Sequence, residues 1–215
     1  MIGNIQLKVC GLTSAADARA AARAGADYLG FILWPKSPRF IALDAWKKLA
    51  ADLPAGPGRV AVMVEPGVAE LSAALAAGFD FAQIHFSRAA PAAMLPEWSR
   101  FAGRERLWLA PKLPPETDVA EAWLPLADTF LLDTFHAGGF GGSGRTGDWA
   151  KFARHQAAHP EKTWILAGGL APENIGAALA ASGARFVDVS SGVEASPGVK
   201  DHARLAALAK MLGAA

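Results

Sequence analysis

Short runs rich in Val, Ile, Leu and Phe alternate with alanine-rich stretches along the whole chain of 215 residues. Each run has the length of a strand and is separated from the next by a helix-sized segment rather than by a tight turn. This pattern predicts parallel strands covered by helices. The expected strands are residues 5–10, 27–33, 59–64, 80–85, 106–111, 128–133, 163–168 and 185–190.

The helical stretches carry start and stop signals. Ser14 is a good N-cap and Gly25 a good stop for the first helix, and Pro172 and Gly183 bracket the seventh. No linker rich in Pro, Gly or Ser divides the chain. We therefore expect one α/β domain over residues 1–215, a single-domain (β/α)8 TIM barrel near the small end of that fold's range. An open doubly wound sheet remains the structural alternative, because periodicity alone does not exclude it.

The alternation within strands predicts which side chains enter the barrel. In the first strand Leu7 and Val9 belong on the helix side, which leaves Lys8 and Cys10 pointing inward. The same alternation turns Asp133 inward at the end of the sixth strand. Polar groups inside such a barrel gather at its carboxyl-terminal mouth, where active sites of this fold are built. The other polar residues expected on the inner side are Gln83, His85 and Asp188.

Cys10 and Asp133 each allow two interpretations. A single buried cysteine is commonly a small hydrophobic residue, but at the end of a barrel strand its thiolate can also act as a base. An inward aspartate is either a structural ion-pair partner or a catalytic acid. Lys8 would favour the thiolate of Cys10 if it lies close enough, although its position in the strand places it deeper in the barrel.

Composition and charge limit the kinds of binding partner and the cellular compartment that we expect. Hydrophobic residues make up 52% of the chain, enough for a substantial core, and the net charge of +1 provides no long-range field for nucleic acid or an anionic membrane. No apolar run reaches the length of a membrane span, and no signal peptide is evident. With one cysteine and therefore no internal disulfide, we expect a cytoplasmic protein.

A glycine-rich segment, GGFGGSGRTGDW at residues 138–149, matches two nucleotide-binding patterns incompletely. Its glycines fit G-x-G-x-x-G, and the P-loop pattern fits except that Arg145 replaces the lysine. Asp148 is a good N-cap for a helix that follows. We expect a mobile loop that covers a substrate rather than a nucleotide cradle, with a plain flexible loop as the alternative.

Two later loops and one arginine suggest an anionic ligand. Glycine and serine follow the seventh and eighth strands, where exposed backbone N–H groups bind phosphate in this fold; ordinary helix capping is the alternative. Arg39 follows the second strand and has a guanidinium that can hold a carboxylate through two parallel hydrogen bonds. The two loops are LAGGLAPEN (166–174) and VDVSSGVEASPGVKD (187–201).

Together these motifs closely resemble those of the phosphoribosylanthranilate isomerase family, (β/α)8 enzymes of tryptophan biosynthesis. The similarity extends over nearly the whole chain. The segments that carry it are KVCGLT (8–13), GADYLGFILWPKSPR (25–39), LLDT (131–134), GGSGRTGDW (141–149), LAGGLAPEN (166–174) and VDVSSGVEASPGVKD (187–201).

The resemblance implies an isomerase that converts N-(5-phosphoribosyl)anthranilate by an Amadori rearrangement. It assigns Cys10 as general base, Asp133 as general acid and Arg39 as the anchor of the anthranilate carboxylate. It also implies that the phosphate is held by the backbone around Gly168, Gly169, Ser190, Ser191 and Gly192. One acid and one base suffice for this chemistry, so we expect no metal and no organic cofactor. The partner is then a small phosphorylated sugar–anthranilate substrate.

The sequence departs from the family pattern at Phe86 and Gly147, which are expected to affect substrate fit more than activity. Two other functions stay open. One is an isomerase that also accepts the related aminoaldose of histidine biosynthesis; the other is a non-catalytic phosphosugar or nucleotide-binding module. Trp46 and Trp98, taken as exposed, belong either to helix packing or to an interface, so both a monomer and a homodimer are compatible with the sequence.

Overall fold

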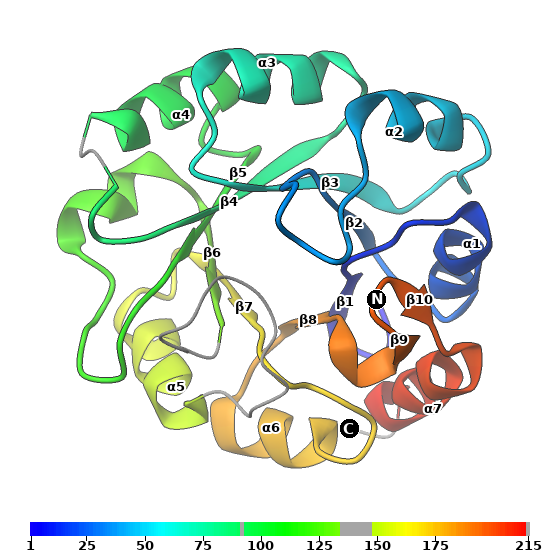
Figure 1. Ribbon diagram of the computed structural model, residues 1–215. Helices are drawn as coiled ribbons and strands as arrows, with labels where there is room; N and C mark the ends of the chain where they lie inside the picture. The colour runs from blue at the N-terminus through cyan, green and yellow to red at the C-terminus, as the bar shows by residue number, and fades with distance from the viewer. Residues whose placement is uncertain (91–92, 134–147, 214–215) are drawn as a thin grey trace.

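The eight expected strands form a closed barrel, which excludes the open doubly wound sheet (Figure 1). The computed structural model describes residues 1–90, 93–133 and 148–213. Each strand pairs in parallel with its neighbours in the sequence, and β1 closes the barrel against β8. The barrel strands are β1 (Gln6–Val9), β2 (Tyr28–Ile32), β3 (Gly58–Val64), β4 (Phe81–Phe86), β5 (Leu107–Pro111), β6 (Thr129–Leu132), β7 (Thr163–Leu166) and β8 (Phe186–Val189).

Helices surround the barrel on the outside, as Figure 1 shows. Within the described residues no helix is long and apolar enough to cross a membrane. The α-helices are α1 (Ala15–Arg23), α2 (Leu43–Ala50), α3 (Val68–Ala76), α4 (Met94–Ala102), α5 (Trp149–Ala158), α6 (Ile175–Ser182) and α7 (His202–Gly213).

Two connections depart from the simple alternation of strand and α-helix. Between β5 and β6 the chain forms only a short 3-10 helix, η1 (Glu121–Leu126). Pro114, Pro115 and Pro125 lie in this connection, and proline cannot donate the backbone hydrogen bonds that an α-helix needs. After β8 the chain forms a second 3-10 turn, η2 (Ser191–Val193), and a small hairpin of β9 (Glu194–Ser196) and β10 (Val199–Lys200) before α7.

The start and stop signals act as predicted. The Ser14 hydroxyl accepts a hydrogen bond from the backbone N–H of Asp17 at 3.1 Å, and the Asp148 carboxylate accepts one from Lys151 at 2.8 Å. Gly183 ends α6 in the left-handed conformation, with φ of 66°. These caps satisfy N–H and C=O groups that a helix end leaves unpaired.

The main hydrophobic core lies between the barrel and the helices and contains Trp46 and Trp98. Both were expected to be exposed, and that expectation is wrong, because each has an exposed fraction of 0%. Each indole N–H is satisfied inside the core, by the carbonyl of Ala77 for Trp46 and of Pro66 for Trp98. Neither tryptophan therefore provides an interface.

A second, smaller core fills the inside of the barrel. At its amino-terminal end Tyr28, Phe81, Trp108 and Phe186 form a layer of aromatic rings, with centroids 5.0 to 5.6 Å apart. Edge-to-face and stacked contacts of this kind pack tightly and leave little free volume. The ring layer closes the bottom of the barrel, so polar groups at the carboxyl-terminal end surround the space that remains open.

Candidate active site

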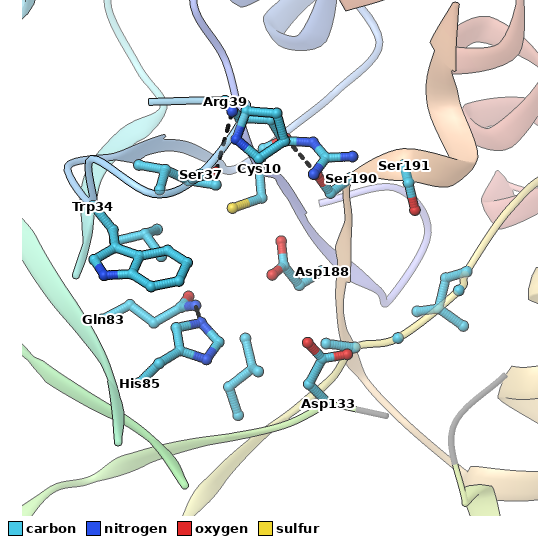
Figure 2. A pocket seen from close by; sticks show the side chains of 18 of the residues that line it. Cys10, Trp34, Ser37, Arg39, Gln83, His85, Asp133, Asp188, Ser190 and Ser191 are labelled. Atoms are coloured by element: carbon cyan, nitrogen blue, oxygen red, sulfur yellow. Dashed lines mark hydrogen bonds between the residues drawn. The ribbon is translucent and has the colours of Figure 1, made fainter. Parts of the chain in front are cut away.

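A pocket of about 320 Å³ opens at the carboxyl-terminal mouth of the barrel (Figure 2). Strand ends and loops from both halves of the chain contribute to it, which places sequence-distant residues together. Gly192 is not among the residues that line it. The sequence-predicted site residues that line the pocket are Cys10, Arg39, Gln83, His85, Asp133, Gly168, Gly169, Asp188, Ser190 and Ser191.

Cys10 and Asp133 face this pocket from different strands, as Figure 2 shows. Cys10 immediately follows β1, and Asp133 immediately follows β6. Cys10 is buried in the inner core, yet it also lines the pocket. The alternation of side chains therefore predicted both inward positions correctly.

Lys8 lies below Cys10 and forms an ion pair with Asp188 inside the barrel. The Nζ of Lys8 is 2.9 Å from Oδ2 of Asp188, and the lysine side chain is fully buried. Gly30 on β2 makes room for this group, since an added Cβ there would lie 3.0 Å from both Cys10 Sγ and Lys8 Cε. Lys8 is thus close enough to influence the thiol, in spite of its depth.

Burial and charge act in opposite directions on Cys10. Burial raises the pKa of the thiol, and the positive charge of Lys8 only partly offsets this. Burial also lowers the pKa of Lys8, but the charge of Asp188, together with that of Cys10 once it ionises, outweighs this effect and leaves that pKa raised. Lys8 therefore stays protonated, and the resting Cys10 is a thiol whose ionisation Lys8 promotes.

Gln83 and His85 form a hydrogen-bonded pair on β4. Their Nε2 atoms are 2.8 Å apart, and burial together with the charge of Lys8 lowers the pKa of His85 to about 4. His85 is therefore neutral near pH 7, and its Nε2 accepts the hydrogen bond from the amide. Within the described residues, Oε1 of Gln83 and Oδ1 of Asp188 are buried without a hydrogen-bond partner. Both residues line the pocket, so two buried acceptors in its wall lack a partner among the described residues.

Arg39 lies at the mouth, but its guanidinium already binds a carboxylate of the protein. Its Nε is 2.8 Å and its Nη2 2.7 Å from the two oxygens of Glu194. Arg39 was expected to bind a ligand carboxylate, and its pairing with Glu194 was not predicted. The two residues are 155 positions apart, and no local pattern connects them.

The proposed phosphate loops bring unusual backbone conformations to the pocket. Gly168 and Gly169 have φ of 96° and 61°, which favour glycine, and within the described part of the chain neither N–H donates to another backbone carbonyl. Gly192 packs so closely on the carbonyl of Leu170 that an added Cβ would overlap it. A compact turn whose N–H groups have no backbone partner suits an anion.

The structure corrects the expectation about Phe86 and does not describe the glycine loop. Phe86 was expected to affect substrate fit, but it packs outside the barrel against Trp98 and Trp123 and does not line the pocket, so that expectation is wrong. Trp34, which sequence analysis did not single out, lines the pocket (Figure 2). The glycine loop from 138 to 147, with Gly147, lies outside the described residues. No cluster of His, Cys, Asp and Glu suited to a metal ion occurs in the described ranges.

Known proteins show the same fold and sequence pattern. Residues 7–211 match the family model described as N-(5'-phosphoribosyl)anthranilate isomerase. The enzyme of that name from Neisseria gonorrhoeae is 38% identical over 208 residues, with 94% of each chain covered.

Solved structures agree with this match. Monomers generated from the dimeric phosphoribosylanthranilate isomerase of Thermotoga maritima have a TM-score of 0.77 and 30% identity, covering 97% of this chain and 98% of the other. A phosphoribosylanthranilate isomerase solved in complex with reduced 1-(o-carboxyphenylamino)-1-deoxyribulose 5-phosphate has a TM-score of 0.77 and 29% identity over 98% and 100% of the two chains. The chain belongs to the N-(5'-phosphoribosyl)anthranilate isomerase family.

Proposed function

We propose that this protein isomerises N-(5'-phosphoribosyl)anthranilate to 1-(o-carboxyphenylamino)-1-deoxyribulose 5-phosphate, a step of tryptophan biosynthesis. The observation that carries the proposal is the placement of Cys10 and Asp133 on the same pocket, at the ends of β1 and β6. A base and an acid at separate points of one cavity are what an aldose–ketose rearrangement requires. Membership of the isomerase family supports the same reaction.

The pocket has complementary groups for each part of this substrate. The glycine and serine loops after β7 and β8 offer backbone N–H groups to the phosphate. Arg39 at the mouth provides a positive charge for the anthranilate carboxylate. The unpartnered acceptors of Gln83 and Asp188 suit the hydroxyl groups of the ribose between these two ends.

Asp133 is proposed to start the reaction as general acid. It gives a proton to the furanose ring oxygen while the bond from that oxygen to C1 breaks. The nitrogen lone pair forms the new C1–N double bond, so the opened sugar becomes an iminium ion. Binding of both ends of the substrate holds the sugar in place during this step, which lowers the entropic cost.

Cys10 is proposed to act as general base in the second step. Its thiolate removes the proton from C2, and the electron pair of that C–H bond moves toward the iminium carbon to give an enolamine. The enolamine then tautomerises to the ketone. Because the iminium is an electron sink, the C2 proton becomes acidic enough for a thiolate.

Two alternative functions make different predictions in a steady-state assay. The purified protein is assayed with N-(5'-phosphoribosyl)anthranilate and with the histidine-pathway aminoaldose, and the binding of ATP and NAD is measured in parallel. The proposal expects turnover of the first substrate alone. Turnover of both would indicate the broader isomerase, whereas no turnover with tight nucleotide binding would indicate a binding module.

The assembly and the compartment are part of the proposal. We expect a cytoplasmic monomer or homodimer, and the dimeric relative from Thermotoga maritima makes the homodimer the first assembly to test. Light scattering of the purified protein across a range of concentrations distinguishes the two assemblies.

A further inference from the structure

The guanidinium of Arg39 is fixed by a buried carboxylate. Glu194 accepts hydrogen bonds from Arg39 Nε at 2.8 Å and from Nη2 at 2.7 Å, a side-on arrangement with two nearly parallel bonds. The exposed fractions of the two side chains are 12% for Arg39 and 4% for Glu194. Bidentate pairs of this kind set the orientation of the planar guanidinium as well as its position.

Glu194 is itself fixed from the opposite side by the β9–β10 hairpin. Its Oε1 accepts a hydrogen bond from Nζ of Lys200 at 2.8 Å and another from the N–H of Gly198 at 3.2 Å. The Lys200 side chain is fully buried and also donates to the carbonyl of Ser190 at 3.3 Å. The carboxylate therefore has little freedom to turn away from Arg39.

The stem of Arg39 is confined as well. It crosses Gly11, where an added Cβ would lie 2.5 Å from Arg39 Cδ and 3.1 Å from Ser190 Oγ. Gly11 also has φ of 75°, a conformation that favours glycine. Figure 2 shows the arginine beside Cys10 and Ser190 at the edge of the pocket.

This arrangement leaves part of the arginine available to a ligand. A guanidinium has five N–H donors, and Glu194 uses Nε and one hydrogen of Nη2. The edge formed by Nη1 and the second hydrogen of Nη2 can still meet a carboxylate end-on. An isolated Arg39–Glu194 pair would be neutral, but Lys200 brings the formal charge of the three groups back to +1.

We propose that Glu194 and Lys200 are positioning residues. They keep the Nη1–Nη2 edge of the Arg39 guanidinium directed toward the anthranilate carboxylate of the substrate. The proposal rests on the function proposed above for Arg39. Neither residue touches the reacting atoms, so each is expected to affect substrate binding through Arg39 and not the proton transfers themselves.

The first test is the Glu194→Gln variant, which keeps the shape of the side chain and removes its charge. An amide NH2 in place of one oxygen faces the donors of Arg39 or Lys200, so the guanidinium is released from its fixed orientation. We expect KM to rise about tenfold, with kcat changed less than about threefold, the size of effect for losing a charge-assisted hydrogen bond. Asp128→Asn, which breaks an exposed pair with Arg104 immediately before β6, at the opposite end of the barrel from the pocket, is the matched control and leaves KM unchanged.

Binding measurements distinguish an effect at the carboxylate end of the site from an effect at its phosphate end. The reduced product analogue carries both a carboxylate and a phosphate, whereas inorganic phosphate reports the phosphate loops alone. Glu194→Gln is expected to weaken binding of the analogue in parallel with KM and to leave inhibition by phosphate unchanged. Equal weakening of both ligands would show a general structural defect and would overturn the positioning role.

A double-mutant cycle shows whether Glu194 acts through Arg39. In an Arg39→Ala background, Glu194→Gln should change KM by less than about twofold, because the group to be positioned is gone. A full tenfold effect in that background would overturn the proposal. If Glu194→Gln does not fold, Glu194→Asp tests the same point, since the shorter side chain keeps the charge but cannot maintain both bonds.

Failure of this inference is distinguishable from failure of the proposed function. Wild-type protein without isomerase turnover would contradict the function, and the binding constants of the analogue would still report on Arg39. Wild-type turnover combined with unchanged KM and analogue binding in Glu194→Gln would preserve the function and overturn the positioning role.

Discussion

Lys8 and Asp188 form an ion pair in the interior of the barrel, with Nζ 2.9 Å from Oδ2 and the lysine side chain fully buried. The pair lies beneath the thiol of Cys10 and supplies the positive charge that partly offsets the effect of burial on its ionisation. Because a buried charge is costly without its partner, the pair also couples the chemistry of the site to the stability of the fold.

Removing one member of this pair should destabilise the protein. Lys8→Met leaves the Asp188 carboxylate buried and unpaired, which is expected to lower the free energy of unfolding by about 3–5 kcal/mol. The double variant Lys8→Met/Asp188→Leu replaces both charges by apolar groups and should recover much of that loss. Urea denaturation of the three proteins measures this, and a loss below about 1 kcal/mol in the single variant would contradict a tightly coupled pair.

The thiol of Cys10 should ionise at higher pH than an exposed cysteine. Burial disfavours the thiolate and raises the pKa, so the rate of alkylation by iodoacetamide should rise with pH and reach half its maximum above the ordinary value of about 8.5. Cys10 is the only cysteine of the chain, so labelling reports on it alone. Lys8→Met should move the midpoint further upward, and a midpoint at or below the ordinary value would contradict this description.

His85 should make the fold sensitive to mild acid. Its pKa of about 4 in the folded state lies below the unfolded value near 6.5, so the unfolded chain binds more protons between these pH values. The free energy of unfolding should therefore fall as the pH is lowered through this window, by about 2–3 kcal/mol from this group. His85→Gln should show a shallower fall in urea denaturation from pH 7 to pH 4.5. Parallel curves for the two proteins would contradict the shift.

Gly192 should tolerate no side chain. An added Cβ would overlap the carbonyl of Leu170, so Gly192→Ala must displace one of the two phosphate loops. We expect about tenfold weaker inhibition by inorganic phosphate and a stability loss of about 1–3 kcal/mol. Gly176→Ala in α6, where an added Cβ meets nothing within 4 Å, is the matched control and should leave both quantities unchanged or slightly raise stability. Equal effects of the two substitutions would argue against the close packing of the loops.

Local patterns predicted the architecture well because the barrel repeats one unit. All eight strands occur where the apolar runs indicate, since strand length, parity and helix caps are properties of short segments. The same parity placed Cys10 and Asp133 at the mouth. It also places Phe86 outward, next to the inward His85, so the error about Phe86 came from not applying the alternation to the end of β4.

Contacts between distant segments could not be predicted in the same way. Glu194 binds Arg39 only because the hairpin after β8 meets the loop after β2 when the barrel closes. Trp46 is buried because the helices pack together and a carbonyl of Ala77 satisfies its indole N–H, which no periodicity reveals. The 3-10 segment η1 could have been foreseen from Pro125 within it and from Pro114 and Pro115 before it.

The thiol of Cys10 and the carboxyl group of Asp133 are proposed to carry out the two proton transfers. The most direct measurement compares kcat on N-(5'-phosphoribosyl)anthranilate with the dissociation constant of the reduced product analogue for wild type, Cys10→Ala and Asp133→Asn. We expect each substitution to lower kcat by about a thousandfold and to change the dissociation constant by less than about threefold. Turnover close to that of wild type in either variant would contradict it.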